Sequence, residues 1–283
     1  MKSKNLLVVV ILFAIFACSK NDNATPTPVT PPLVVDTADL IVTTFLPTTN
    51  SIWWKYNTTT TVITPAPVAP ATGITNGLDQ LNVDSDLIIA TIPYKLMKTT
   101  TTPTGFYSTM LNNNKLRVDG SSIKMTGNVL FNLGTNSIPL SVNNFTIFKE
   151  NAIFGSNLGV PQTGTQNFTI PNSTQVIKVN YTLTSVADND IASLLVGTTN
   201  YTNLKVVKIY VQIDASTEIA PGVSVQALNP TSQPVIISTQ YWVKNVGVVK
   251  AETRVEYHLA GATAGVPQDG LQNVVETINS KSF

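Results

Sequence analysis

The side chains best suited to catalysis are scarce in this sequence of 283 residues. It contains one cysteine, Cys18, and one histidine, His258. A second histidine is lacking, and Cys18 lies in a segment with the features of a lipid anchor, which excludes a zinc site or a Cys–His pair. A Ser-His-Asp triad would need His258, yet no nucleophile elbow, P-loop or dinucleotide fingerprint is present. We therefore expect a chain that is not an enzyme, with no catalytic residues, no metal and no cofactor.

Two close pairs of carboxylates are the remaining candidates for chemistry. They are Asp84 with Asp86 and Asp188 with Asp190. Their oxygens suit calcium, but neither pair lies in an EF-hand loop, and turn or capping roles explain them equally well. A glycosidase would need two acids about 5 to 9.5 Å apart in a cleft, a spacing that sequence alone does not place. An envelope hydrolase is therefore the third of three hypotheses for function, behind a binding module and a structural or adhesive protein.

Cys18 follows an apolar segment at the start of the chain. Lys2 and Lys4 precede the apolar residues 6–16. A run of about a dozen residues is shorter than the roughly 20 that cross a bilayer as a helix, and it fits the core of a signal peptide. The order Ile15-Phe16-Ala17-Cys18 resembles a bacterial lipobox. That resemblance implies acylation of Cys18, with chains such as palmitate, and cleavage in front of it.

The residues after Cys18 predict how the chain is divided and where it resides. We predict a lipoprotein signal peptide over 1–17, the lipidated Cys18 with a Thr/Pro-rich tether over 18–33, and a single β-rich domain over 34–283. Ser19 stands where an aspartate commonly retains lipoproteins at the inner membrane, and Lys20 begins a stretch that resembles a Bacteroidota surface-export signal. We therefore expect a lipid-anchored protein of the outer membrane that faces the cell surface, with the periplasmic face as the alternative.

The amino-acid composition of the chain limits the kinds of partner that it can bind. The 17 basic and 16 acidic residues nearly cancel, and charged residues are 12% of the chain. Nucleic acid needs a basic face, so we expect no nucleic-acid partner. Thr, Asn and Ser supply much of the polarity, which suits an extracellular β-protein.

Period-two alternation of apolar and polar residues predicts the fold class. It is clearest over 248–259, where Val249, Ala251, Thr253, Val255, Tyr257 and Leu259 share one face, and it recurs over 176–183 and 206–213. We predict an all-β or mainly β fold, a curved antiparallel sheet resembling a half-barrel, with few short helices.

Two segments are predicted to form structures other than strands of this sheet. In 188–197, Asp188 or Asn189 as a cap and Gly197 at the end predict a short helix, with a buried strand as the alternative. The proline-rich residues 60–73 predict a surface loop between early strands.

Two stretches carry a family resemblance. They are "FLPTTNSIWWKY" (45–56) and the pair "YTNLKVVKIYVQI" and "QYWVKNVGVVKAE" (201–213 and 240–252). Together they resemble bacterial, Bacteroidota-type envelope lipoproteins of a mostly uncharacterised family, whose half-barrel domain is related to the lipoprotein-carrier fold. The resemblance implies a curved sheet without an established activity. Asn245 stands where a glycine is usual, and Asn245 and Gly247 both tolerate a left-handed backbone, so we expect a turn there.

Alternation also predicts which side chains would face a ligand. If the concave face of the sheet holds a lipid or another hydrophobic ligand, the candidate ligand-facing residues are Trp54, Tyr56, Tyr181 and Trp242, with Val179, Ile209 and Val211 beside them. Consecutive Trp53 and Trp54 point to opposite faces of a strand. If that face is filled by its own side chains, the protein is structural or adhesive. Trp242 and Tyr241 then form a structural corner.

Overall fold

Long strands account for most of the structure, a computed structural model that describes residues 45–63, 73–133, 136–169, 176–220, 223–228, 234–261 and 268–283. These residues all fall in the compact unit Thr37–Phe283. The predicted signal peptide over 1–17 and the predicted tether over 18–33, with Cys18, lie outside the described residues. Among those described, no helix has the length and apolarity needed to span a membrane. The strands are β1 (Trp53–Ile63), β2 (Gly73–Ile89), β3 (Ile92–Thr99), β4 (Lys115–Asp119), β5 (Ser122–Leu133), β6 (Asn136–Lys149), β7 (Gln162–Thr169), β8 (Val176–Ala187), β9 (Ile191–Val196), β10 (Thr199–Ala220), β11 (Val223–Gln226), β12 (Ile236–Val243), β13 (Gly247–His258) and β14 (Asp269–Lys281), and the helix is α1 (Phe106–Leu111).

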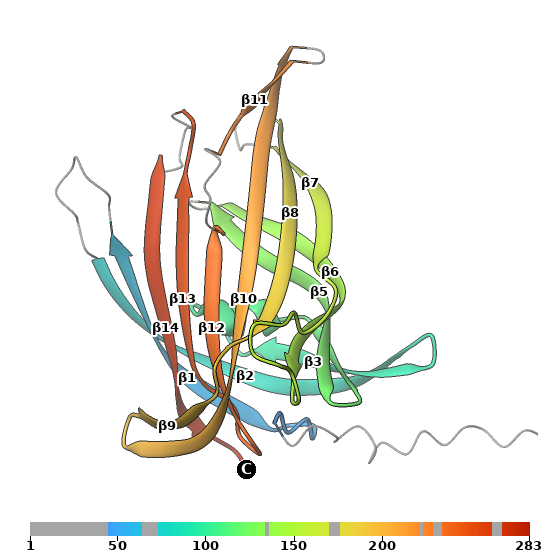
Figure 1. Cartoon of the computed structure of the whole chain (residues 1–283), viewed down its shortest axis with the longest axis vertical. Helices are drawn as coiled ribbons and strands as arrows, with labels where there is room; N and C mark the ends of the chain where they lie inside the picture. The colour runs from blue at the N-terminus through green and yellow to red at the C-terminus, as the bar shows by residue number, and fades with distance from the viewer. Residues whose placement is uncertain are drawn as a thin grey trace, which may run out of the picture. The chain divides into compact units, whose positions relative to one another are not determined.

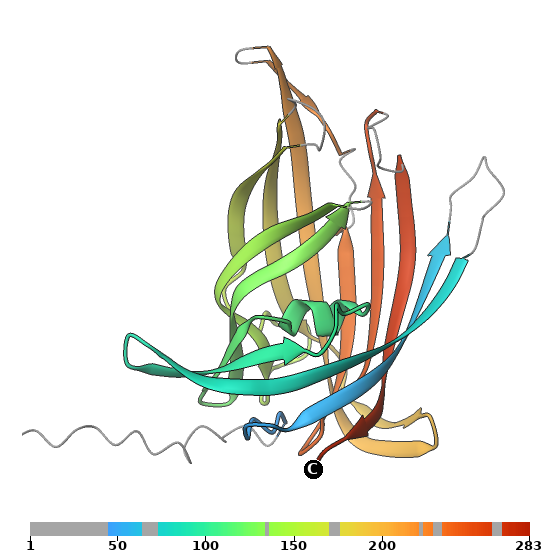
Figure 2. The ribbon, with the colours of Figure 1, turned by 180° about the vertical axis from the view of Figure 1, so that it is seen from behind.

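The strands form one antiparallel sheet that curls around its own inner face (Figures 1 and 2). Its order is β6-β5-β4-β3-β2-β1-β14-β13-β12-β10-β8-β7, and β9 and β11 each pair with β10. Register shifts between Lys55 and Tyr56, and between Tyr241 and Trp242, mark bulges, which bend and twist strands. The predicted curved, mainly β sheet with few short helices is confirmed.

The two edge strands, β6 and β7, approach each other and nearly close the sheet into a barrel. Side chains of β8, the strand that pairs with β7, reach across this seam to β6. The hydroxyl of Tyr181 donates to the carbonyl of Ser141 at 2.8 Å, and the hydroxyl of Ser185 donates to the carbonyl of Thr146 at 2.5 Å. Closure leaves less of each edge open to another chain.

The predicted alternation is confirmed over much of the sheet. Tyr181 and its inward-facing neighbours at 177, 179 and 183 are buried, as are those at 207, 209, 211 and 213. In β13, Ala251, Thr253, Val255 and Tyr257 are buried. Val249 instead packs in a second cluster on the opposite side, with Val196, Leu204 and Val243, next to the bulge that shifts the register.

The short helix predicted over 188–197 is wrong. Residues 191–196 form strand β9, which pairs with the start of β10. Gly197 has a φ of 59° and turns this hairpin instead of ending a helix. The loop predicted over 60–73 is wrong at its start, because β1 continues to Ile63, while 64–72 lie outside the described residues.

The turn predicted before β13 is confirmed. Asn245 has a φ of 60° and Gly247 a φ of 101°. Both values lie in the left-handed region, which asparagine and glycine adopt more readily than other residues.

Candidate functional site

Three of the four aromatic residues predicted to face a ligand meet in the packed floor of the barrel. Trp54, Tyr56 and Trp242 have no exposed surface. The indole N–H of Trp54 donates to the backbone carbonyl of Val246 at 2.6 Å, and the hydroxyl of Tyr56 donates to the backbone carbonyl of Val248 at 2.9 Å. These bonds fix the aromatic rings to the turn that leads into β13.

Tyr107 of α1 fills the space between these rings. Its ring centroid lies 5.6 Å from that of Tyr56 and 6.3 Å from that of Trp242, both edge-to-face. Phe148 also packs against Trp242, with ring centroids 4.8 Å apart and the ring planes tilted by 36°. Aromatic pairs in such arrangements add to the stabilisation that burial provides. The floor is therefore filled by the chain's own side chains.

Tyr181, the fourth predicted residue, lies apart from this floor. It belongs to the seam, where its ring packs against Gly164 so closely that a Cβ there would lie 2.2 Å from the tyrosine oxygen. It also borders a surface depression of about 360 Å³. The other lining residues are polar or glycine, namely Thr163, Gly164, Thr165, Asn180, Thr182, Gln212 and Asp214.

Two buried carboxylates hold the start of α1 inside the barrel. Glu276 of β14 accepts hydrogen bonds from the backbone N–H of Tyr107 at 2.6 Å and from that of Ser108 at 2.9 Å. Asp79 of β2 accepts from the backbone N–H of Thr104 and, at 2.8 Å, from that of Gly105. Both acids are almost completely buried. Glu276 thereby satisfies N–H groups that the first turn of a helix leaves without partners, and Asp79 satisfies those of the two residues just before the helix.

Burial raises the pKa of Glu276 to about 7. The hydrogen bonds from Ser108 and Tyr107 oppose this rise because they favour the charged form, while the charge of Asp79 adds to it. Burial also raises the pKa of Tyr107 well above its usual value. Close packing requires Gly105, because a Cβ there would lie 2.1 Å from the Glu276 carboxyl. We interpret this carboxyl as a structural clamp on α1.

Above the packed floor, a cavity of about 390 Å³ opens where β1 and β13 end and β14 begins. It continues into a smaller space of about 50 Å³ that reaches Phe106 and Thr109 of α1. We call the larger space the mouth cavity. Its lining residues are Thr60, Val62, Ile63, Thr104, Asn132, Val255, Tyr257, Asp269, Gly270, Leu271, Gln272 and Val274.

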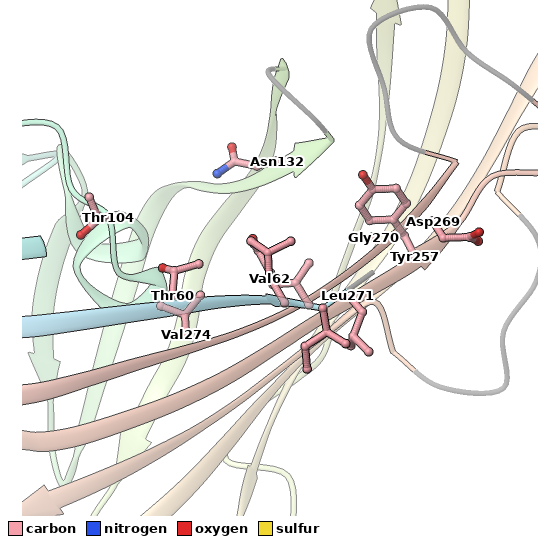
Figure 3. Close-up of a pocket in the computed structure, with 12 residues that line it drawn as sticks. Thr60, Val62, Thr104, Asn132, Tyr257, Asp269, Gly270, Leu271 and Val274 are labelled. Atoms are coloured by element: carbon pink, nitrogen blue, oxygen red, sulfur yellow. The ribbon is translucent and has the colours of Figure 1, made fainter. Parts of the chain in front are cut away.

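The inward-facing rows of three strands build this cavity. Thr60 and Val62 continue the row that begins with Trp54, and Val274 continues the row of Glu276. Figure 3 shows Thr60, Val62 and Tyr257 on one side of the opening, with Asn132 and Thr104 across from them. The same face of the sheet is thus packed at one end and open at the other.

Gly270 gives the wall of the cavity its shape. A Cβ at Gly270 would lie 2.1 Å from the Tyr257 ring. Since no real Cβ comes that close, the ring occupies the space that a side chain would take. The ring also packs edge-to-face on Phe131 of β5, with centroids 6.4 Å apart. Tyr257 therefore braces the cavity wall against the opposite side of the barrel.

The lining combines apolar side chains with uncharged hydrogen-bonding groups. Val62, Val255 and Val274 provide apolar surface, while hydroxyls and amides come from Thr60, Thr104, Asn132 and Gln272. Asp269 is the one ionisable carboxylate among the twelve lining residues, and none of these is lysine or arginine. The Asp269 carboxylate lies 2.7 Å from Nδ1 of His258. The wall therefore offers no cation to an anionic group.

The acidic pairs singled out in the sequence are engaged in ion pairs. Asp84 pairs with Lys98 and Asp86 with Lys95, while Asp188 and Asp190 pair with Lys208 and Lys205. Within the described ranges, no three histidine, cysteine, aspartate or glutamate side chains are grouped so as to hold a metal ion. Each of the four carboxylates is thus engaged by a lysine.

The sequence reasoning missed most of the mouth cavity. Strand β14 contributes five of the lining residues, and it was not predicted as a strand. Its inward-facing row of Gly270, Gln272, Val274 and Glu276 mixes glycine and polar residues, so apolar alternation does not reveal it. A weaker signal exists in the β-branched residues Val274, Val275 and Thr277.

Comparison with protein families, with characterised proteins and with solved structures finds no match to this chain. The resemblance to envelope lipoproteins therefore stays a prediction.

Proposed function

We propose that this chain is a lipid-anchored outer-membrane lipoprotein that acts as a non-catalytic binding module. Its mouth cavity takes an uncharged ligand with an apolar portion, such as a neutral lipid. The observation that carries the proposal is an open cavity with a mixed lining, placed directly above a fully packed floor. A volume of about 390 Å³ falls within the range of about 300–1,000 Å³ found for small-molecule sites.

The charge of the lining supports the choice of ligand class. Taking a carboxylate or phosphate out of water is costly unless a cation or several donors receive it. The lining residues provide no lysine or arginine, and Asp269 would repel an anion. Hydroxyls and amides can instead bind the alcohol, ester or amide groups of a neutral molecule.

The direction of the strands relates the cavity to the expected anchor. The described chain begins at Phe45 and enters the sheet at Trp53, and β1 lines the cavity from Thr60, seven residues later, to Ile63. At about 3.3 Å per residue, this places the cavity about 23 to 33 Å along the strand from Trp53. Attachment at Cys18 is thus compatible with a cavity that faces away from the membrane, toward ligands in solution. We propose a location at the cell surface because the residues after Cys18 resemble an export signal.

A structural or adhesive surface protein is the second candidate. The packed floor favours it, because Trp54, Tyr56 and Trp242 are used as core and leave no aromatic platform there. Under this alternative the mouth cavity is a by-product of an incompletely filled barrel and binds nothing.

Binding of three amphiphiles with identical chains tests the proposal. Dodecanol, dodecanoate and dodecyltrimethylammonium would be competed against a fluorescent neutral hydrophobic probe on the full chain. We expect dodecanol to displace the probe at least tenfold more effectively than dodecanoate. Failure of the probe to bind, or preference for dodecanoate, would contradict the assigned ligand class.

A matched pair of variants locates the binding. Val62 lines the cavity, whereas Val176 at the start of β8 does not, and both are 43% exposed. We expect Val62→Trp to fill the cavity and abolish probe binding, and Val176→Trp to bind like the original chain. Mass spectrometry of native extracts would then identify the molecule that is carried, while an extract without bound molecules would favour the structural alternative.

A further inference from the structure

The hairpin of β2 and β3 projects from the body of the barrel. Strand β3 pairs with β4 only at Lys95 and Leu96, whereas β2 and β3 pair with each other as far as Ile89 and Ile92. The end of the hairpin is therefore a two-stranded ribbon without a third strand beside it. Both ribbon views show it extending away from the rest of the sheet (Figures 1 and 2).

The tip of this ribbon is apolar and exposed. Ile88, Ile89 and Ile92 are 64%, 40% and 37% exposed. No charged residue lies between Asp86 and Lys95 in the sequence. A two-stranded ribbon is marginal in water, and exposed apolar groups of this kind mark interaction sites. We call Ile88, Ile89 and Ile92 the hairpin tip.

The base of the ribbon is fixed beside the point where the described chain begins. Lys95 and Asp86 form an ion pair across the two strands. The side-chain amide of Asn50 donates to Asp86 at 2.9 Å and accepts from Lys95 at 2.9 Å. Asn50 lies only five residues after Phe45, the first described residue. The hairpin therefore leaves the barrel next to the entry of the N-terminal chain.

We propose that the hairpin tip inserts into the lipid leaflet that carries the anchor at Cys18. This inference rests on the anchor that is part of the proposed function. Residues 19–44 join Cys18 to Phe45, where the described chain begins. A chain can cover up to about 3.1–3.6 Å per residue, so the bilayer lies within reach of the tip. Three isoleucines without a charge suit the acyl region, whereas the ion pair at the ribbon base suits the headgroups.

The opposite end of β2 provides a matched control. Ile74 is 67% exposed, close to the 64% of Ile88, but it lies fourteen residues earlier in the same strand. At about 3.3 Å per residue the two positions are about 46 Å apart along the strand. A contact made by the hairpin tip should therefore leave Ile74 in water.

The test uses the mature lipidated chain reconstituted into phosphatidylethanolamine–phosphatidylglycerol vesicles. Cys18 is blocked by its own acylation, so an environment-sensitive fluorophore attaches only to a cysteine introduced as Ile88→Cys or Ile74→Cys. We expect the label at 88 to shift to the blue and to be quenched by brominated lipid, and the label at 74 to do neither. A further chain carries the label at a cysteine introduced as Ile89→Cys. In that chain, adding the substitution Ile88→Asp should remove the blue shift of the label.

The outcomes separate this inference from the anchor. A chain that floats with vesicles but reports water at position 88 overturns the hairpin contact and leaves the anchor in place. A chain that does not float overturns the anchor, and the hairpin contact falls with it. Self-association that is lost in Ile88→Asp would assign the tip to a second copy of the chain and would also overturn the lipid contact.

Discussion

Glu276 holds Ser108 from a strand that lies 168 residues later in the sequence. One carboxylate oxygen accepts both the backbone N–H of Ser108, at 2.9 Å, and its hydroxyl, at 2.8 Å. The other accepts the backbone N–H of Tyr107. A helix of six residues gains little stability from its own turns, so this contact between distant segments keeps α1 inside the barrel.

Stability should depend on pH through Glu276. Its pKa is raised from 4.5 to about 7 on folding, so between these values the folded state keeps a proton that the unfolded state has released. The free energy of unfolding contributed by this group is therefore greatest below pH 4.5. This contribution decreases as pH rises, and above pH 7 it is about 3 kcal/mol smaller than below pH 4.5. Urea titrations at several pH values would measure this slope.

Glu276→Gln isolates that effect. The amide is neutral at every pH, so we expect the difference in stability between variant and original to change between pH 4.5 and 7. At pH 5 the variant should be about 1–3 kcal/mol less stable, because one amide group cannot accept all three hydrogen bonds. Identical pH profiles for the two chains would show that Glu276 is not the titrating group.

Adjacent tryptophans should differ sharply in their contribution to stability. Trp54 is fully buried, whereas Trp53 is half-buried on the opposite face with Lys55 5.0 Å above its ring. We expect Trp54→Ala to cost about 3–5 kcal/mol of unfolding free energy and Trp53→Ala less than about 1 kcal/mol. Thermal and urea unfolding would compare them, and equal losses would contradict the assignment of faces.

The seam should open when its tyrosine loses the hydroxyl. Tyr181→Phe removes the bond to the Ser141 carbonyl, with an expected cost of about 0.5–1.5 kcal/mol. Hydrogen exchange should become faster in β6 and β7, because these edges are not joined by a continuous strand ladder. Tyr210→Phe, on the outer face of β10, is the control and should leave exchange at the seam unchanged. Uniform acceleration over the whole sheet would argue against a local seam.

The fold class could be predicted because alternation acts within each strand. Val179, Tyr181 and Val211 are inward-facing in the sequence pattern and are buried in the structure. Strand β9 is predicted only as the alternative to a helix for a related reason: it is short and mostly exposed, so its apolar residues fit a helical pattern as well as an extended one.

The helix and the cavity could not be predicted because both depend on distant partners. Helix α1 is capped by Glu276, so the local sequence carries no capping signal for it. The mouth cavity forms where inward-facing residues of β1, β13 and β14 are not packed against side chains from across the barrel. Alternation shows which residues face inward, but not whether other side chains pack against them. The same alternation placed Trp54, Tyr56 and Trp242 inward, but it did not distinguish a packed floor from a cavity.

A buried amide offers a site where stability can be gained. Gln240 has no exposed surface, and neither atom of its amide has a hydrogen-bond partner among the described residues. It stands between Val207 and Ala251 on the inner face. We expect Gln240→Met to raise the free energy of unfolding by about 1–3 kcal/mol, because the unpaired polar group is removed at similar volume. Gln212→Met, at an exposed position of β10, should change it by less than about 0.5 kcal/mol.

Adding one methyl group at the cavity wall should couple stability to binding. In Gly270→Ala the new Cβ would lie 2.1 Å from the Tyr257 ring, so the ring must move. We expect a loss of about 1–3 kcal/mol in unfolding free energy from overpacking, together with weaker binding of the neutral probe.

Two further variants decide whether the Tyr257 ring is responsible. Gly73→Ala adds a Cβ with no atom within 4 Å and should alter neither stability nor binding appreciably. In a double-mutant cycle, Tyr257→Leu should remove most of the cost of Gly270→Ala, since the smaller side chain leaves room for the methyl group. Additive losses in that cycle would mean that the methyl group acts elsewhere. Binding that survives Gly270→Ala unchanged would separate the probe site from this wall, because a displaced ring must change the shape of the mouth cavity.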